Sequence, residues 1–399
     1  MSVPLSAPPK SRSENNSTVT ELYPNADKVE FIDLRAQQKL IRGRVEQRLL
    51  SVLDHGRYIN GPEIHELEDV LTKRVGANAV ACASGTDALM IGLLASGVGP
   101  GDAVFLPAMT YNATANAVLL LGATPVFVDI DPDTFNLDPV DLSERISDVV
   151  SKGGLTPKMV IPVDLFGLPA DYKSIKTVAA EYNLIVMADA AQGFGGTQDG
   201  VEACGLAPIS ATSFFPGKSL GAYGDAGAVF AKDDALADTF HSIRWHGTDA
   251  SRKISERVGF NGRMDSFQAA VLLEKLSIFD DELIARRRVD AIYRDRLKHT
   301  CRFQRVAEGT SSGCGYFSVR VRGRDRVADE LKSAGIPTAI YYATPLHRMP
   351  AFAHLAPKGG LPNTDAVANE IISLPMHPYL TGLHVDRVCD AVLDTASPY

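Results

Sequence analysis

Short apolar runs alternate with helical stretches through the middle of the chain. The runs are almost uniformly apolar, and polar residues or turn residues bound them. Continuous apolar strands separated by helices indicate parallel strands that are buried on both faces of a sheet. The predicted strands cover residues 79–82, 103–106, 125–128, 158–163, 184–188 and 226–230.

The chain on either side of this region has different patterns. Apolar residues at helical spacing predict helices before, within and after the sheet region. Toward the C-terminus, strand and helix patterns mix in a way that indicates a smaller α+β lobe. The predicted elements are a short strand at 31–34 within the segment 29–53 that continues as an amphipathic helix, helices at 63–75, 87–95, 264–296 and 328–334, a strand at 316–321 and an apolar segment at 336–341.

We therefore expect an α/β protein with two domains. The large domain, with a mostly parallel sheet, is predicted at residues 29–285, and the small α+β domain at residues 286–399. Residues 1–28 are rich in Ser, Pro and Asn and lack an apolar core, so they predict a disordered extension rather than a signal peptide.

Composition narrows the classes of partner. The 399 residues carry a net charge of -8, which argues against a nucleic-acid-binding surface because neutralising phosphates requires clustered Lys and Arg. The five cysteines are scattered without a CxxC pair, as is typical of reduced thiols in a cytosolic protein. No apolar run approaches the ~18 residues of a membrane span. We therefore expect a cytoplasmic protein without nucleic acid, membrane or metal partners.

A lysine and an aspartate carry the strongest chemical signal. Lys218 lies in a Ser- and Gly-rich turn after Phe214 and Phe215, and Asp189 ends the apolar run at 184–188. Such a lysine can form a Schiff base with an aldehyde cofactor, and such an aspartate can face a pyridinium nitrogen. Together they predict pyridoxal 5'-phosphate (PLP) chemistry. The alternatives are an exposed lysine in a glycine turn and an aspartate that caps the next helix.

The turn at residues 83–89 follows a predicted strand and opens a helix. Free backbone N–H groups at a helix N-terminus suit a phosphate, so Gly85 and Thr86 are candidates for binding one. Ser213, at the end of the strand before Lys218, can add a hydroxyl. The alternative is an ordinary helix cap, which is the usual role of Ser and Thr in such turns.

Further candidates lie near strand ends and turns, and each also fits a structural role. Tyr111 can stack on a planar cofactor or pack in the core, and Gln192 can bind a ring hydroxyl or lie at the surface. The segment 261–268 can be a loop that caps a helix, and a lone histidine such as His347 is usually structural. The remaining candidates in these two segments are Asn261, Arg263 and Tyr342.

With these residues in view, the chain resembles the DegT/DnrJ/StrS family of PLP-dependent sugar aminotransferases. The resemblance extends over about residues 31–393 and rests on several separate motifs in the family's order. The matching segments are 31–34, 58–63, 84–86, 189–192, 213–221, 223–225, 261–264 and 345–347.

The resemblance implies a role for each candidate. It also implies the type I, aspartate aminotransferase-like fold, in a homodimer with both active sites at the interface. The implied catalytic residues are Lys218, which carries the Schiff base, and Asp189, which pairs with the pyridine nitrogen. The implied cofactor contacts are Gly85, Thr86, Tyr111, Gln192, Ser213 and, from the neighbouring subunit, Asn261. The implied substrate contacts are Arg263, Tyr342 and His347.

Two segments, 338–347 and 373–379, are similar to the branch of the family that acts on UDP-linked keto sugars. The resemblance therefore implies transfer of an amino group from L-glutamate to a keto sugar nucleotide, for a surface polysaccharide such as lipopolysaccharide. The implied substrate is UDP-2-acetamido-2-deoxy-3-oxo-D-glucuronate or a related UDP- or dTDP-4-keto sugar. Ala226, where glycine is usual, and Arg348–Met349 depart from the family pattern, and the second departure leaves the sugar open.

Two rival functions stay open at this point. A PLP-dependent dehydratase would act on similar sugars, but dehydratases of the family carry a histidine at the position of Lys218. A non-catalytic sensor could keep the PLP fold, although no missing catalytic residue favours it. A dinucleotide-binding oxidoreductase is set aside because no G-x-G-x-x-G follows the first strand.

Overall fold

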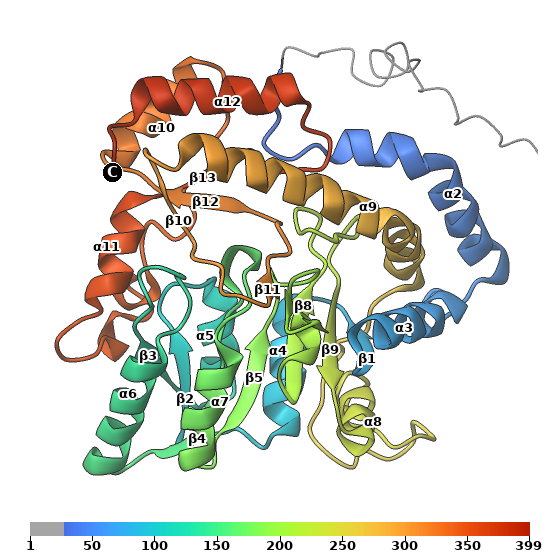
Figure 1. The fold of residues 1–399 in the computed structure, drawn as a ribbon. Coiled ribbons are helices and arrows are strands. Elements are labelled where there is room, and N and C mark those ends of the chain that lie inside the picture. Colours follow the sequence, from blue (N-terminus) through green and yellow to red (C-terminus); the bar gives the residue numbers. More distant parts are fainter. Residues whose placement is uncertain (1–27) are drawn as a thin grey trace, which may run out of the picture.

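A seven-stranded sheet forms the centre of the computed structural model, which describes residues 28–399 (Figure 1). The extension predicted at 1–28 lies outside the described residues except for Lys28. The strand order is β1-β9-β8-β5-β4-β2-β3. The bounds are β1 Asn78–Cys82, β2 Asp102–Pro107, β3 Thr124–Val128, β4 Thr156–Val160, β5 Ile185–Asp189, β8 Ile209–Ser213 and β9 Gly227–Ala231.

The sheet is parallel except at one strand. β9 pairs antiparallel with both β1 and β8, so the prediction of a parallel strand at 226–230 is wrong. Parallel neighbours need a crossover, usually a helix, whereas residues 214–226 between β8 and β9 contain only turns. The predicted strand at 158–163 is also too long, because β4 ends at Val160 and Val163 makes only an isolated bridge.

Helices cover both faces of the sheet because alternate strand residues point to opposite sides. On β1, for example, Val80 and Cys82 pack with one apolar cluster, and Ala79 and Ala81 with another. The first cluster holds α4 (Gly85–Ala95), α5 (Asn112–Leu120) and α8 (Asp234–Ile243) against the sheet. The opposite face is covered by α3 (Pro62–Val75), α6 (Pro139–Lys152), α7 (Tyr172–Glu181) and part of α9 (Ser266–Leu297).

The strand predicted at 31–34 does not form. Instead, helix α2 begins at Leu34 and runs to His55. Asp33 is its N-cap, and its carboxylate accepts a hydrogen bond from the backbone N–H of Ala36 at 2.9 Å. An N-cap aspartate satisfies a helix N–H that otherwise lacks a partner, which favours the helix start here over a strand.

A smaller α+β layer follows α9, and α9 itself runs through the domain boundary predicted at residue 285. Three antiparallel strands in the order β10-β12-β13 pack there with α10 and α12. The sequence patterns missed β13, α11 and α12, and no strand forms at 336–341. The bounds are β10 Arg302–Phe303, β12 Phe317–Arg320, α10 Arg324–Ser333, α11 Pro362–Glu370, β13 Ile371–Leu374 and α12 Gly382–Thr395.

Short elements complete the chain. They are β6 Thr197–Gln198, β7 Val201–Glu202 and β11 Thr310–Ser311, which form a third sheet, and the 3-10 turns η1 Leu165–Gly167, η2 Ala203–Gly205, η3 Leu346–Arg348 and η4 Ala353–Leu355. Within residues 28–399, no helix has the length and apolar character needed to cross a bilayer.

Candidate active site

Lys218 lies in the loop that joins β8 to the antiparallel β9. The loop is held by backbone hydrogen bonds, among them Lys218 N to Phe215 O at 2.9 Å and Ala222 N to Phe214 O at 2.7 Å. At Gly221 a Cβ atom would lie 2.6 Å from the carbonyl oxygen of Phe215. A side chain at this position would therefore clash with the loop backbone, which explains the need for glycine.

The side chain of Lys218 is partly buried. Burial lowers the pKa of Lys218, while the negative charge of Asp189 and the nearby Tyr111 act to raise it. Its Nζ atom lies 5.8 Å from the centroid of the Tyr316 ring. A lysine with a lowered pKa is more readily available as the uncharged amine, the form that attacks a carbonyl carbon.

Asp189 ends β5 and is 5% exposed. Its Oδ2 atom accepts a hydrogen bond from Thr114 Oγ1 at 2.8 Å, and its Oδ1 atom accepts one from Ala191 N at 3.2 Å. Burial raises the pKa of Asp189, and these hydrogen bonds together with the charge of Lys218 oppose the rise. The carboxylate is thus fixed in direction beside the lysine and can receive a hydrogen bond from a ring nitrogen.

The N-terminus of α4 lies against the end of β8. Ser84 caps the helix by accepting from Asp87 N at 3.0 Å, and the first helical hydrogen bond runs from Ala88 N to Ser84 O. The N–H groups of Gly85 and Thr86 precede that bond and point away from the helix. A Cβ at Gly85 would lie 2.7 Å from Ser213 Cβ, so glycine lets the two segments touch.

Capping and phosphate binding are therefore compatible at this turn. Ser84 provides the cap, and the first two amides of α4 remain for an anion beside the Ser213 hydroxyl. The amine, the carboxylate and this turn come from the ends of β8 and β5 and the start of α4. Their chemistry fits the aldehyde, the pyridine nitrogen and the phosphate of PLP.

Gln192 is a buried amide rather than a surface one. Its Oε1 atom accepts from Phe166 N at 2.8 Å, and its Nε2 atom donates to the Tyr342 hydroxyl at 2.7 Å. Tyr342 has a left-handed backbone with φ of 63° and packs against the Phe166 ring. The structure therefore brings together two candidates, one predicted to bind the cofactor and one the substrate.

Tyr111 is the N-cap residue of α5, and its side chain is 63% exposed. It lies close enough to Lys218 to influence the pKa of the amine. The exposure of this ring excludes the alternative of core packing, and the ring is free to cover a planar cofactor beside Lys218.

The other three candidates have different neighbours. Among residues 28–399, no hydrogen bond, ion pair or ring contact joins Asn261, Arg263 or His347 to Lys218 or Asp189. The loop of Asn261 is tied to the α4 turn, because Gly262 O accepts from Ala83 N at 2.9 Å. Arg263 stacks on Trp245, with 4.3 Å from its Cζ atom to the ring centroid.

His347 is buried against the acidic side chain of Asp365, at 3.1 Å between Nε2 and Oδ1. Burial lowers the pKa of His347, and the charge of Asp365 acts against this. Arg348, one of the departures from the family pattern, is exposed and pairs with the same carboxylate. The histidine therefore belongs to a charged cluster at the edge of the site.

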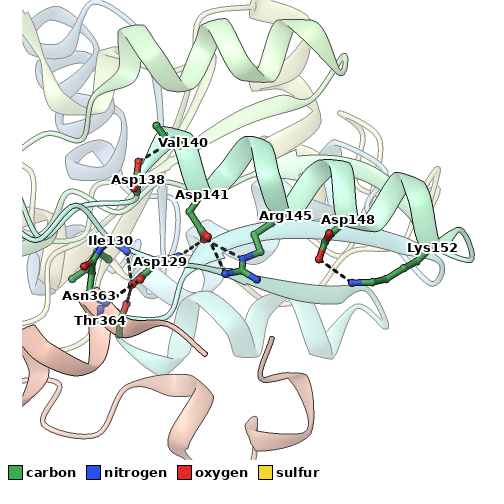
Figure 2. Close-up of polar contacts among 10 residues, drawn as sticks. All are labelled: Asp129, Ile130, Asp138, Val140, Asp141, Arg145, Asp148, Lys152, Asn363 and Thr364. Atoms are coloured by element: carbon green, nitrogen blue, oxygen red, sulfur yellow. Dashed lines mark hydrogen bonds and ion pairs between the residues drawn. The ribbon is translucent and has the colours of Figure 1, made fainter. Parts of the chain in front are cut away.

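Asp129 connects the helix that carries Asp365 to the central sheet, and Figure 2 shows its contacts with Asn363 and Thr364. It lies just beyond β3 and caps α11, because its carboxylate accepts from Asn363 N at 3.0 Å and from Thr364 N at 2.8 Å. The Thr364 hydroxyl donates to it as well, at 2.6 Å. Asp365 follows in the same helical turn, so the cap fixes the carboxylate that meets His347.

Three residues around the lysine and the aspartate were not predicted. Thr114 holds Asp189, and Thr110 contacts Thr114 at 3.0 Å between the hydroxyl oxygens. The sequence feature that could have revealed the two threonines is their spacing of one helical turn, just after a strand that ends in proline. Tyr316 was assigned to a strand, but β12 begins one residue later and leaves its ring against Lys218.

The chain is similar to known proteins over most of its length. The sequence model of the DegT/DnrJ/EryC1/StrS aminotransferase family matches residues 39–393. Over 374 residues the chain is 46% identical to the UDP-2-acetamido-2-deoxy-3-oxo-D-glucuronate aminotransferase of Pseudomonas aeruginosa, covering 91% of this chain and 99% of the relative.

Solved structures are similar over most of their length. A DegT DnrJ EryC1 StrS aminotransferase from Brucella abortus superposes with a TM-score of 0.90 at 43% identity, covering 92% of this chain and 98% of the other. NtdA from Bacillus subtilis, solved with bound cofactor PMP, superposes with a TM-score of 0.80 at 30% identity, covering 91% of this chain and 82% of the other.

Proposed function

This chain belongs to the DegT/DnrJ/EryC1/StrS aminotransferase family, and we propose that it transfers an amino group from L-glutamate to a UDP-linked keto sugar. It is a PLP-dependent sugar aminotransferase with an α/β fold of type I. The fold class, the enzyme class and the cofactor predicted from the sequence are thereby confirmed.

The observation that carries the proposal is the pair formed by the partly buried Lys218 and the buried Asp189, whose charges act on each other. PLP bound here would supply an electron sink for the electron pair left on the α-carbon of the amino donor when its proton is removed. Asp189, held by Thr114 and Ala191, would keep the pyridine nitrogen protonated. Lys218 Nζ would hold the cofactor and carry the proton, which its lowered pKa favours.

An acidic sugar is the substrate we propose, with UDP-2-acetamido-2-deoxy-3-oxo-D-glucuronate first. The support is the near full-length relative that is named for this sugar. Arg263 is suited to the sugar carboxylate because its Nε atom is buried and has no hydrogen-bond partner in residues 28–399. A guanidinium can bind a carboxylate with two parallel hydrogen bonds. His347 and Tyr342 stay predictions as further contacts.

We also propose a homodimer in which each protomer completes the active site of the other. Several aromatic side chains near the lysine loop are exposed in one chain, which is unusual for monomeric surfaces when they gather in a patch. Asn261 is exposed too, and no hydrogen bond or ion pair joins it to Lys218 within residues 28–399. The exposed aromatic residues are Tyr58, Tyr111, Phe215 and Tyr223.

A cytoplasmic location and a division of the chain near residue 285 stay proposals. All five cysteines are free and buried, which suits a reducing compartment. Their buried positions also explain their scattered spacing, because they pack as small apolar residues.

The direct test is a coupled assay with L-glutamate and a panel of keto sugar nucleotides. We expect 2-oxoglutarate and an amino sugar nucleotide to form together, fastest with the 3-oxo-glucuronate. Loss of water from the sugar without 2-oxoglutarate would instead establish a dehydratase. Cofactor binding without amine exchange with any donor would instead favour a non-catalytic sensor.

A further inference from the structure

A large basic cavity lies apart from the lysine site. It has a volume of about 1020 Å³ and opens between α9, β10, β12 and the segment around β11. None of the predicted cofactor or substrate residues lines it. Two acidic side chains, Asp133 and Asp290, line it, against six basic ones: Arg287, Arg294, Lys298, Arg302, Arg305 and Arg320. Basic side chains thus outnumber acidic ones in the lining although the chain carries a net charge of -8, and Lys298 and Arg305 are paired, with Asp295 and with Asp131 and Asp133.

Helix α9 contributes a basic stripe to this cavity. Arg287, Arg294 and Lys298 follow one another at intervals of seven and four residues, which places them on one face of a helix. The helix packs its apolar residues against both domains, as Val289 and Leu283 do. The stripe therefore faces the cavity from a rigid element.

The opposite wall presents two arginines to each other. Arg302 on β10 and Arg320 on β12 are directly opposed in the antiparallel ladder. Like charges in this position destabilise a sheet unless a counter-charge is present. Arg320 has one, because Glu370 lies 2.7 Å from its Nη2 atom. The side chain of Arg302 lies against the Tyr399 ring, 5.1 Å from its Cζ atom to the centroid, and forms no ion pair within residues 28–399.

A second guanidinium is also without a carboxylate partner. Arg287 donates to the carbonyl oxygen of Gly195 at 3.2 Å and to Ser311 Oγ at 3.3 Å, both neutral groups. Arg294, by contrast, pairs with Asp290 at 2.8 Å. Arg287 and Arg302 thus line one cavity, and neither forms an ion pair with a carboxylate within residues 28–399, although the charge of Arg287 acts on the pKa of Glu202.

We propose that this cavity binds an anion that carries a diphosphate group. Guanidinium groups match phosphate oxygens with two parallel hydrogen bonds, and two guanidinium groups without a carboxylate partner suit two linked phosphoryl groups. The hydroxyls of Ser311 and Ser312 line the same wall and add donors. The volume exceeds that of a bare diphosphate and leaves space for an organic group beside Phe303 and Val306.

Titration calorimetry on the full-length, PLP-loaded protein tests this site. The probes are inorganic pyrophosphate and UDP, with orthophosphate as the weaker comparison. We expect pyrophosphate to bind wild-type protein, and Arg302→Gln or Arg287→Gln each to weaken it by about tenfold or more, since each removes a charged hydrogen-bond donor. Arg302→Lys, which retains the charge, should lose less.

Arg322→Gln is the matched control. Arg322 contacts the same Tyr399 ring, with 5.2 Å from its Cζ atom to the centroid, but it does not line the cavity. Unchanged pyrophosphate affinity is expected in this variant. Tighter binding of UDP than of pyrophosphate, lost in Arg302→Gln, would identify a nucleoside diphosphate as the ligand, and equal binding would identify the bare diphosphate.

Two outcomes would overturn the proposal. One is no detectable binding of pyrophosphate or UDP outside the lysine site. The other is an affinity that both Arg302→Gln and Arg287→Gln leave unchanged while their PLP absorption shows that they are folded. Neither outcome would affect the proposed aminotransferase function, because the amine assay reports on a separate site.

Discussion

Thr114 is the residue that most directly controls the charge of Asp189. Its hydroxyl donates to the carboxylate at 2.8 Å, and this hydrogen bond opposes the rise in pKa that burial causes. Since Asp189 must be ionised to keep the cofactor nitrogen protonated, the threonine positions and tunes the group that does the chemistry.

Thr114→Val is therefore expected to slow amino transfer by about tenfold or more, because hydrogen bonds to charged groups contribute ~1.5–3 kcal/mol. Loss of the donor raises the pKa of Asp189 further, so the acidic limb of the pH–rate profile should move to higher pH. Thr110→Val, which touches Thr114 but not Asp189, should change the profile less. An unchanged acidic limb in Thr114→Val would contradict this role.

Asp164 is a second buried carboxyl with an identifiable effect on stability. Burial raises its pKa to about 7, against ~3.9 in an unfolded chain. Between these values the folded protein holds a proton that the unfolded chain has lost, so the free energy of unfolding falls as pH rises from about 4 to 7. Its neighbours are Tyr172, whose hydroxyl donates to it at 2.8 Å, and Asp189.

Asp164→Asn should remove this dependence. The amide oxygen can still accept from Ala170 N and the Tyr172 hydroxyl, which both bond Oδ1 in the wild type. In urea unfolding of the PLP-loaded proteins, the free energy of unfolding of the variant should rise relative to that of wild type as pH rises from 5 to 8. Parallel pH curves for the two proteins would show that Asp164 does not titrate in this range.

At the scale of elements, the connection between β8 and β9 decides where the lysine lies. Apolar runs predicted most strands of the central sheet, but a run does not encode its direction. The direction of β9 follows from the turns at 214–226, and these turns also place Lys218 beside the strand ends. Short strands such as β10 gave no usable pattern, because two residues cannot show a period.

The α11 cap shows how an element end can support the site. Asp129→Ala removes the acceptor for three backbone amides, two of them in α11, and for one hydroxyl (Figure 2). We expect the free energy of unfolding to fall by about 2 kcal/mol or more, since cap losses alone cost ~0.5–2 kcal/mol. Chemical denaturation measures this change.

Asp138→Ala is the control for that variant. Asp138 caps α6 through one hydrogen bond to Val140 N at 2.8 Å. Burial and the nearby Asp131, Asp141 and Asp129 raise the pKa of Asp138, so its removal also relieves repulsion and should cost less. Equal losses in the two variants would argue against a special role for Asp129.

At the scale of the whole molecule, the prediction from sequence succeeded where chemistry and local pattern coincide. Sequence patterns could identify Lys218, Asp189 and the α4 turn because these residues lie at or just after the ends of strands or at the start of a helix. Thr114 and Tyr316 were missed because only tertiary contacts give them a role. Asn261, Arg263 and His347 rested on the resemblance alone, and their roles stay predictions.

The shared active site of the proposed dimer can be tested with mixed subunits. Lys218→Ala and Asn261→Asp homodimers should each have little activity. If Asn261 serves the partner's site, equal mixing with subunit exchange should restore about a quarter of wild-type activity, because half of the dimers then contain one intact site. No recovery, with exchange confirmed by mass, would place Asn261 in the site of its own chain.

The central claim is that Lys218 holds PLP and exchanges its amine with L-glutamate. The most direct test is the absorption spectrum of the purified protein with PLP, before and after L-glutamate alone. We predict a visible band that Lys218→Ala lacks, and its replacement by the near-ultraviolet band of the aminated cofactor as 2-oxoglutarate appears. A wild-type protein that forms no visible band with PLP would contradict the assignment of Lys218 and the mechanism built on it.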